Sequence, residues 1–149
     1  MREHPDHHDA ELLLRLYDLR REGTLRQARE WVTQQFHADS ADDLYRRYPY
    51  GSKENAYFRM AISYWDMAAS IVNHGLIKEE FFFENNSEFW FIWEKIKHLM
   101  PKLREARRDP LLCHSLETLA GKYEKWLEAR APGALAVSRE RLKQAAAKE

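Results

Sequence analysis

Cysteine, proline and glycine are scarce in this sequence, and each scarcity excludes something. Cys113 is the only cysteine among 149 residues, so no intramolecular disulfide can form, and we expect a reducing, cytoplasmic location. Five glycines and five prolines, beside abundant Leu, Ala, Glu, Arg and Lys, favour helix over strand nearly everywhere. No stretch approaches ~18 uninterrupted apolar residues. The N-terminus also lacks the apolar core of a signal peptide, so we expect no membrane association.

Net charge and catalytic motifs are missing as well. The 24 basic and 24 acidic residues give a formal net charge of zero, which removes the usual electrostatic case for a nucleic-acid or anionic-membrane binder. The sequence has no Gly-rich phosphate loop, no Gly-x-Ser-x-Gly, no Cys-x-x-Cys and no His-Glu-x-x-His. We therefore expect no cofactor and name no catalytic residue. The sequence therefore favours a protein that is not an enzyme, but it does not exclude an enzyme.

A few histidines and carboxylates invite a metal-site interpretation. His4, His7 and His8 lie near the N-terminus with no further ligand at a fixed spacing, and Glu94 and His98 form one pair four residues apart. A carboxylate-bridged site in a helical bundle needs a Glu-x-x-His motif on two helices. We therefore expect no metal site.

Apolar residues recur at steps of three and four along most of the chain, which predicts a succession of amphipathic helices. The longest, Lys53 to His74, is capped by Ser52 and is apolar on most faces, as is typical of a central helix. A second helix, Ser87 to Arg108, should pack against it, with a kink or a break at Pro101. We predict an all-α, single-domain bundle of about six or seven helices around the long central helix.

Boundaries within the chain follow from polar and helix-breaking residues. Residues 1–8 are expected to be a flexible N-terminus, residues 9–130 the helical bundle domain, and residues 131–149 a C-terminal helix that is lightly packed or projecting. Gly23 should end the first helix, and Thr24 should cap the second. Capping oxygens of Asn85–Ser87 and the pair Asp109 and Pro110 should each begin a later helix.

The central helix carries one polar stripe, at steps of three and four, with His74 at its end. Its other members are Asn55, Arg59, Ser63, Asp66, Ser70 and Asn73. One interpretation is a solvated face, or an internal set of hydrogen bonds that satisfies Arg59 and Asp66. The other is that these small polar residues, flanked by Tyr57, Tyr64 and Trp65, line a pocket for a small ligand.

Aromatic residues concentrate in one segment. Residues 56–93 hold eleven of the nineteen Phe, Trp and Tyr residues, more than one helical face buries. Phe82, Trp90 and Phe91 fall off the inward rows of their predicted helices. They are therefore our candidate anchors for a partner.

The order of features in this region is similar to that of a known family. An aromatic helix is followed by the turn Asn73 to Ile77, an acidic and aromatic stretch, a Trp-containing helix that reaches Pro101, the segment Arg104 to Arg107, and a helix with Leu116 and Leu119. In this respect Ala56 to Leu119 resembles a family of uncharacterised bacterial helical domains. The resemblance implies a helical bundle without an established activity, so it transfers no catalytic residue.

Three functional hypotheses remain open from the sequence. The leading one is a non-catalytic protein-protein interaction or scaffolding module, with another protein or a second copy as partner, carried by the surplus aromatics. The alternative is a small-ligand sensor or enzyme that uses the polar stripe. Nucleic-acid binding through Lys97 to Arg108 is disfavoured, because cations are also favoured at a helix C-terminus and no aromatics interleave with them.

Overall fold

The structure of the protein is a computed structural model that describes residues 4–147. Its regular secondary structure in this range is entirely helical, with no strand there. Its elements are α1 (His7–Arg20), α2 (Gly23–Gln34), α3 (Ala41–Arg47), α4 (Lys53–Asn73), α5 (Glu79–Asn85), α6 (Glu88–Ile96), the 3-10 helix η1 (Lys97–Leu99), α7 (Met100–Arg107), α8 (His114–Arg130) and α9 (Ala134–Ala147). The predicted all-α bundle is confirmed.

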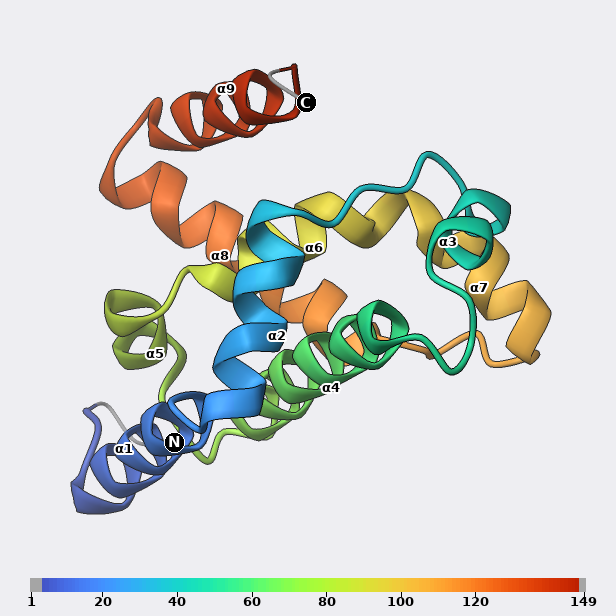
Figure 1. The fold of residues 1–149 in the computed structure, drawn as a ribbon. Coiled ribbons are helices and arrows are strands. Elements are labelled where there is room, and N and C mark those ends of the chain that lie inside the picture. Colours follow the sequence, from blue (N-terminus) through green and yellow to red (C-terminus); the bar gives the residue numbers. More distant parts are fainter. Residues whose placement is uncertain (1–3, 148–149) are drawn as a thin grey trace.

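Helix α4 is the centre of the bundle, as predicted. It runs through the middle of the molecule, with α2 packed on one side and α8 on another (Figure 1). Its side chains are buried on several faces, and Ala61, Ala68 and Ala69 are completely inaccessible. Small residues at these positions let the backbones of neighbouring helices approach closely, which explains why a helix of such apolar composition takes the central place.

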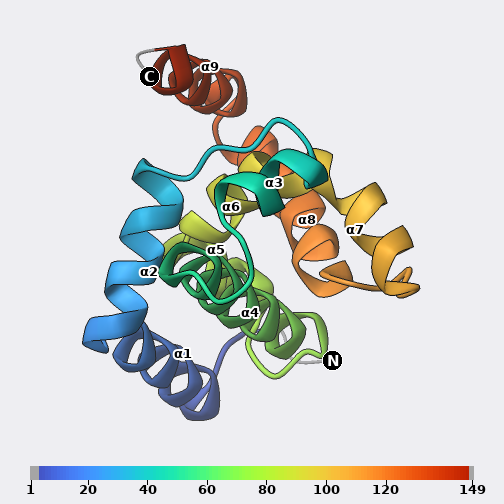
Figure 2. The same cartoon turned by 45° about the vertical axis from the view of Figure 1, so that its right-hand side comes forward.

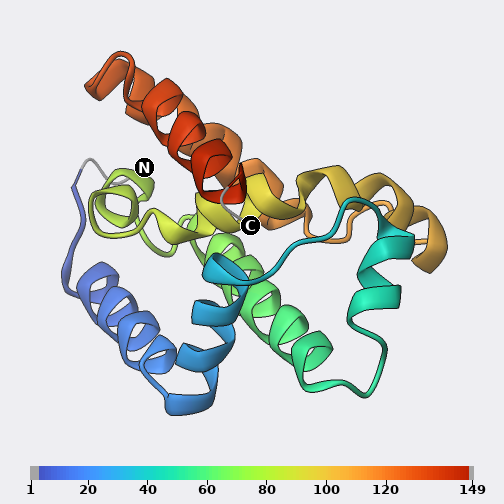
Figure 3. The ribbon, with the colours of Figure 1, turned by 45° about the horizontal axis from the view of Figure 1, so that its top comes forward.

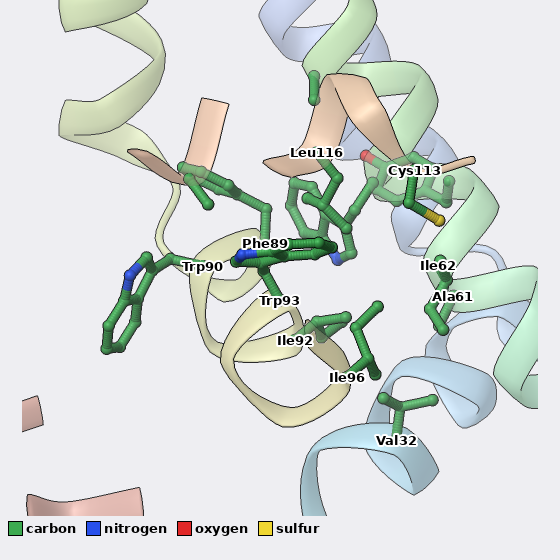
Figure 4. Packing of buried hydrophobic residues seen from close by; sticks show 14 of the residues in the cluster. Val32, Ala61, Ile62, Phe89, Trp90, Ile92, Trp93, Ile96, Cys113 and Leu116 are labelled. Atoms are coloured by element: carbon green, nitrogen blue, oxygen red, sulfur yellow. The ribbon is translucent and has the colours of Figure 1, made fainter. Parts of the chain in front are cut away.

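Helix α6 completes the core beside α4. Val32 of α2, Ile62 of α4, and Ile92 and Ile96 of α6 meet in one cluster (Figure 4). Glu88 at the start of α6 joins the three helices through polar contacts. Its carboxylate accepts hydrogen bonds from the Arg29 guanidinium of α2 at 2.7 and 3.0 Å and from the Trp65 indole of α4 at 2.8 Å.

The remaining helices occupy the two ends of α4. Helices α1 and α5 lie at one end, whereas α3 and α7 lie at the other (Figures 2 and 3). At the first end, the buried Asp9 carboxylate accepts a hydrogen bond from the Lys78 amide at 2.7 Å. At the second end, the turn between α3 and α4 faces α7, and the candidate site described below lies there.

Two helix starts and one helix end can be compared with the sequence predictions. Ser52 caps α4 as predicted, because its Oγ accepts the Asn55 amide at 3.1 Å. Gly23 does not end α1, and Thr24 does not cap α2. Gly23 is instead the first residue of α2, and the carboxylate of Glu22 accepts the Thr24 and Leu25 amides. The acidic side chain replaces the expected hydroxyl cap.

Two later helix caps were predicted wrongly, although α6 begins directly after Ser87 as expected. Ser87 precedes α6 without a side-chain cap, and the side-chain oxygen of Asn86 accepts a hydrogen bond from Arg20 at 2.6 Å. Helix α8 begins at His114 rather than at Pro110, because a turn intervenes and Cys113 adopts a left-handed conformation with φ of 57°. The predicted cap, Asp109, accepts the Leu111 amide within that turn at 3.0 Å.

Pro101 produces a break rather than a kink in one long helix. Helix α6 ends at Ile96, η1 follows as a single 3-10 turn, and α7 begins at Met100 with Pro101 in its first turn. Proline is well tolerated in a first turn, where its missing N–H has no helical partner to lose.

The two ends of the chain are described by the structure only in part. Residues 1–3 and 148–149 of the predicted terminal segments lie outside the described range. Helix α1 begins at His7, two residues earlier than predicted, because Asp6 and Asp9 form a reciprocal capping box. Helix α9 buries no residue fully, and it contacts the bundle through Leu135, Leu142 and Arg139.

Candidate functional site

A groove of about 620 Å³ opens at the end of the bundle where α3, α4 and α7 meet, and we call it the α3–α4–α7 groove. The helices contribute most of its lining, and the turns at residues 48–52 and 108–113 contribute the rest. The lining residues are Leu44, Tyr45, Tyr50, Asn55, Ala56, Phe58, Arg59, Met60, Ile62, Ser63, Asp66, Met100, Leu103, Arg107, Leu112 and Cys113.

The inner walls of the groove are apolar. Leu44 of α3, Phe58 and Ile62 of α4, and Met100 and Leu103 of α7 all border it and are otherwise buried. Met100, Leu103 and Arg107 lie three and four residues apart, so one face of α7 supplies both the apolar wall and a cation at its end. Helix α7 takes this position because the break before Pro101 redirects the chain.

Arg59 lies over the groove with a fixed orientation. Its Nε donates to the Asn55 side-chain oxygen at 3.0 Å, and the Asn55 amide group in turn donates to the Tyr48 carbonyl at 2.9 Å. Asn55 is only 2% exposed, so this support is rigid. Among residues 4–147, Arg59 forms no ion pair, and neither of its terminal nitrogens has a hydrogen-bond partner.

Tyr50 contacts both Arg59 and a second arginine, Arg107, at this end of the groove. Its ring is 63% exposed, stacks on Tyr45 with centroids 5.9 Å apart, and lies 5.6 Å below the Arg59 guanidinium carbon. Its hydroxyl accepts a hydrogen bond from Arg107 at 3.2 Å. Arg107, like Arg59, has no carboxylate partner in the described part of the chain. Two unneutralised guanidinium groups therefore meet at one tyrosine.

Asp66 and Cys113 form the other end of the groove. The Asp66 carboxylate accepts the Leu116 amide of α8 at 3.0 Å, which fixes its position. Cys113 lies beside Ile62 (Figure 4), and burial, followed by the nearby Asp66 charge, raises the pKa of its thiol to about 11. The thiol is therefore protonated at neutral pH, and it is a weak nucleophile.

The polar stripe divides between this groove and the opposite end of α4. Asn55, Arg59, Ser63 and Asp66 line the groove. The rest lie outside it: the Asn73 amide group donates to the Ser115 carbonyl at 2.9 Å, and His74 Nδ1 lies 2.8 Å from the Ser70 carbonyl.

The aromatic side chains expected beside the stripe face elsewhere. Tyr57 donates to Gln27 of α2 at 3.0 Å, Tyr64 donates to the Leu16 carbonyl of α1, and Trp65 donates to Glu88. That expectation was wrong because large rings on α4 fill the spaces toward α1, α2 and α6. The aromatic border of the groove comes instead from Tyr45 and Tyr50.

The surplus aromatics are mostly buried, contrary to the exposure expected of Phe82 and Trp90. Phe82 is completely inaccessible, and Trp90 is 1% exposed. Helix α8 covers the side of α6 that carries Trp90, which the sequence did not reveal. Tyr123 of α8 packs on Trp90, and Glu124 of α8 accepts a hydrogen bond from the Trp90 indole N–H at 3.0 Å. Phe91 is half-buried against the core.

The basic residues from Lys97 to Arg108 are partly neutralised. Lys97 pairs with Glu94 at 2.9 Å, Lys102 with Glu105 at 3.6 Å, and Arg104 with Glu117 at 3.0 Å. Each pair removes one cation from a potential phosphate-binding surface. Within residues 4–147, no group of three histidine, cysteine or acidic side chains is placed to hold a metal.

Tyr50, Arg107 and Cys113 also line the groove, although they are not among the site residues predicted from the sequence. The Pro49-Tyr50-Gly51 turn was a usable signal, because a tyrosine at the tip of a tight turn has no core to enter. Arg107 and Cys113 gave no comparable signal, since their place depends on how α7 and the turn before α8 fold back against α4.

Comparison with families of known sequence gives one match. Residues 5–126 match a family described as Domain of unknown function (DUF4760). Comparisons with curated proteins and with solved structures give no match. The matched range contains Ala56 to Leu119, the region whose resemblance to an uncharacterised helical family was inferred above, and it includes the whole groove but not α9. The chain therefore belongs to the DUF4760 family.

Proposed function

We propose that this protein is a small-ligand-binding module whose site is the α3–α4–α7 groove. The observation that carries the proposal is the pair of arginines without carboxylate partners, Arg59 and Arg107, at the border of an apolar-walled groove. A concave apolar surface with a few convergent polar groups is the usual form of a small-molecule site. The hydrogen bond from Arg59 to the buried Asn55 favours binding, because it reduces the side-chain freedom that a ligand would otherwise have to restrict.

Binding without catalysis is the better-supported form of this proposal. The raised pKa of Cys113 keeps its thiol protonated, and Asp66 is engaged by the Leu116 amide. These are the groups in the groove that would otherwise serve as nucleophile and base. A sensor that couples ligand binding to a partner fits this arrangement better than an enzyme. The cytoplasmic location expected from the sequence is part of the same proposal.

A second candidate function is protein-protein interaction or self-association. Burial of Phe82 and Trp90 weakens the version that depends on these anchors. Exposed apolar side chains on α1 favour another version, since Leu14, Tyr17 and Leu19 are 61%, 46% and 52% exposed.

A fragment titration followed by two-dimensional NMR tests the ligand-binding proposal. Apolar fragments should produce saturable shifts in the amides of α3, α4 and α7. Ser63→Phe, which adds bulk inside the groove, should abolish them, whereas Met67→Phe, one turn further along α4 and outside the groove, should not. Saturable shifts that are unchanged by Ser63→Phe, or none at all, would contradict the proposal.

A further inference from the structure

We propose that the ligand of the α3–α4–α7 groove is a small apolar carboxylic acid, bound as its carboxylate by Arg59 and Arg107. This inference rests on the proposed function and adds the chemical class of the ligand. Three features of the groove support it: the charge at one end, the hydrogen-bonding edge that Arg59 offers, and the apolar walls between α4 and α7.

Charge is distributed unevenly along the groove. Arg59 and Arg107 meet at Tyr50, whereas Asp66, the one lining carboxylate among residues 4–147, lies seven residues further along α4 than Arg59. Seven helical residues correspond to roughly 10 Å. An anionic group is therefore attracted to the Tyr50 end and repelled from the Asp66 end, which sets the direction in which an acid lies.

The Arg59 guanidinium has a hydrogen-bonding edge that suits a carboxylate and that no described residue occupies. Since Asn55 accepts the Nε–H at 3.0 Å, the edge formed by the two terminal nitrogens stays available. That edge offers two parallel N–H groups whose spacing matches the two oxygens of a carboxylate. The Tyr50 hydroxyl accepts from Arg107 at 3.2 Å and keeps its own proton, so it can donate a further hydrogen bond.

The rest of the groove favours a ligand whose remaining part, apart from the carboxylate, is apolar. Phe58, Leu103 and Met100 border it, and within the described part of the chain no cation beyond the two arginines lines it. A highly charged ligand such as a nucleotide would leave phosphate oxygens against these apolar side chains without partners. A short acyl chain or an aryl group would instead bury apolar surface against them.

Calorimetric titration with matched eight-carbon probes tests the inference. Octanoate, 1-octanol and octylamine each contain eight carbons and differ in head-group charge, and inorganic phosphate supplies an anion without an alkyl chain. We expect octanoate to bind about tenfold more tightly than octanol, as one good charge-assisted interaction provides. Octylamine should bind more weakly than octanol, and phosphate should not saturate the site.

Three variants locate the effect. Arg59→Gln and Arg107→Gln should each weaken octanoate binding by about tenfold while leaving octanol binding unchanged. Arg26→Gln removes the same charge from the exposed face of α2, outside the groove, and should change neither. Circular dichroism of each variant verifies that the fold is kept.

The outcomes separate the two proposals. If octanoate and octanol bind equally and the arginine variants have no effect, the carboxylate inference is wrong, although the groove remains a ligand site. If neither binds saturably, the proposed function fails together with the inference. Phosphate that binds more tightly than octanoate would contradict the apolar part of the inference.

Discussion

Individual side chains in this protein differ sharply in what their surroundings allow them to do. Cys113 illustrates this, because a residue often considered for reactivity sits in an environment that suppresses it. Burial and the nearby Asp66 carboxylate raise the pKa of its thiol to about 11 from an ordinary value of 9.0. Arg59 and Arg107 are the contrary case, since nothing in their described surroundings neutralises them.

Alkylation of Cys113 should therefore be slow in the folded protein. The raised pKa alone lowers the thiolate population at pH 8 by about 100-fold, and burial slows access further. Mass spectrometry after timed iodoacetamide treatment measures the rate, with the denatured protein as the reference. Labelling of the native chain at the denatured rate would show that the thiol is not buried as described.

Trp90→Ala should destabilise the fold by about 3–5 kcal/mol, because it leaves a cavity beside Tyr123 and removes a hydrogen bond to Glu124. Phe91→Ala should cost less, about 1–2 kcal/mol, since that ring is only half-buried. Urea denaturation gives both free energies of unfolding. An unchanged free energy of unfolding for Trp90→Ala would contradict the burial of this residue and would favour its role as an exposed anchor for a partner.

At the scale of helices, single polar residues join elements that are distant in the sequence. Glu88 is the clearest case, because its carboxylate contacts both Arg29 of α2 and Trp65 of α4. Asp43 likewise joins the segment before α3 to residues within α3. Its carboxylate accepts the Asp39 amide and pairs with Arg46 and Arg47, and the Asp39 hydrogen bond is the largest cause of a pKa lowered to about 2.

Glu88→Gln should lower the free energy of unfolding by about 1–3 kcal/mol, because the ion pair with Arg29 is lost where both side chains are mostly buried. Glu79→Gln is the matched control. Its carboxylate lies 3.7 Å from Lys122 at the surface, so the change should stay below ~0.5 kcal/mol. Equal effects in thermal or chemical denaturation would mean that Glu88 does not join the helices energetically.

Asp43→Asn should destabilise the protein at neutral pH by an amount that disappears in acid. The carboxyl has a folded-state pKa of about 2 and an ordinary value of 3.8, so its contribution is present above pH 3.8 and is lost as the pH falls toward 2. The difference in free energy of unfolding between native chain and variant should shrink across this range. Asp42→Asn, at the exposed neighbour, is the control, and it should change the free energy of unfolding at neutral pH by less than ~0.5 kcal/mol.

The helices that the sequence predicted well are those whose signals are local. Ser52 and the apolar run behind it sufficed for α4, because cap and periodicity lie within one segment. The start of α8 could not be predicted from Asp109 and Pro110. The left-handed Cys113 precedes its first residue, and the burial of this side chain in the core is not readable from the neighbouring sequence.

At the scale of the molecule, the sequence showed which residues share a helix face but not what covers that face. Four stripe residues, from Asn55 to Asp66, line the groove because α3 and α7 frame this half of α4. The rest of the stripe is close to α8 and to the end of α4. Trp90 is part of the core because α8 packs over α6, and Phe82 of α5 is buried against Phe89 of α6; neither long-range contact has a local signal.

Helix α9 should be dispensable for the fold and for ligand binding. The family match ends at residue 126, and no residue of α9 is fully buried or lines the α3–α4–α7 groove. A chain that ends at Ala131 should lose only about 2 kcal/mol of stability, from Leu135, Leu142 and the contacts of Arg139. Its affinity for octanoate should be unchanged. Loss of folding, seen by circular dichroism, would show that α9 belongs to the core.

The central claim is that the α3–α4–α7 groove binds a small apolar acid, and a structure of the protein saturated with octanoate tests it most directly. We predict the carboxylate on the terminal nitrogens of Arg59, within reach of Tyr50 and Arg107, and the alkyl chain along Phe58 and Leu103. Octanoate bound instead in the second cavity, of about 610 Å³ between α9 and η1, or at no defined position, would contradict the claim.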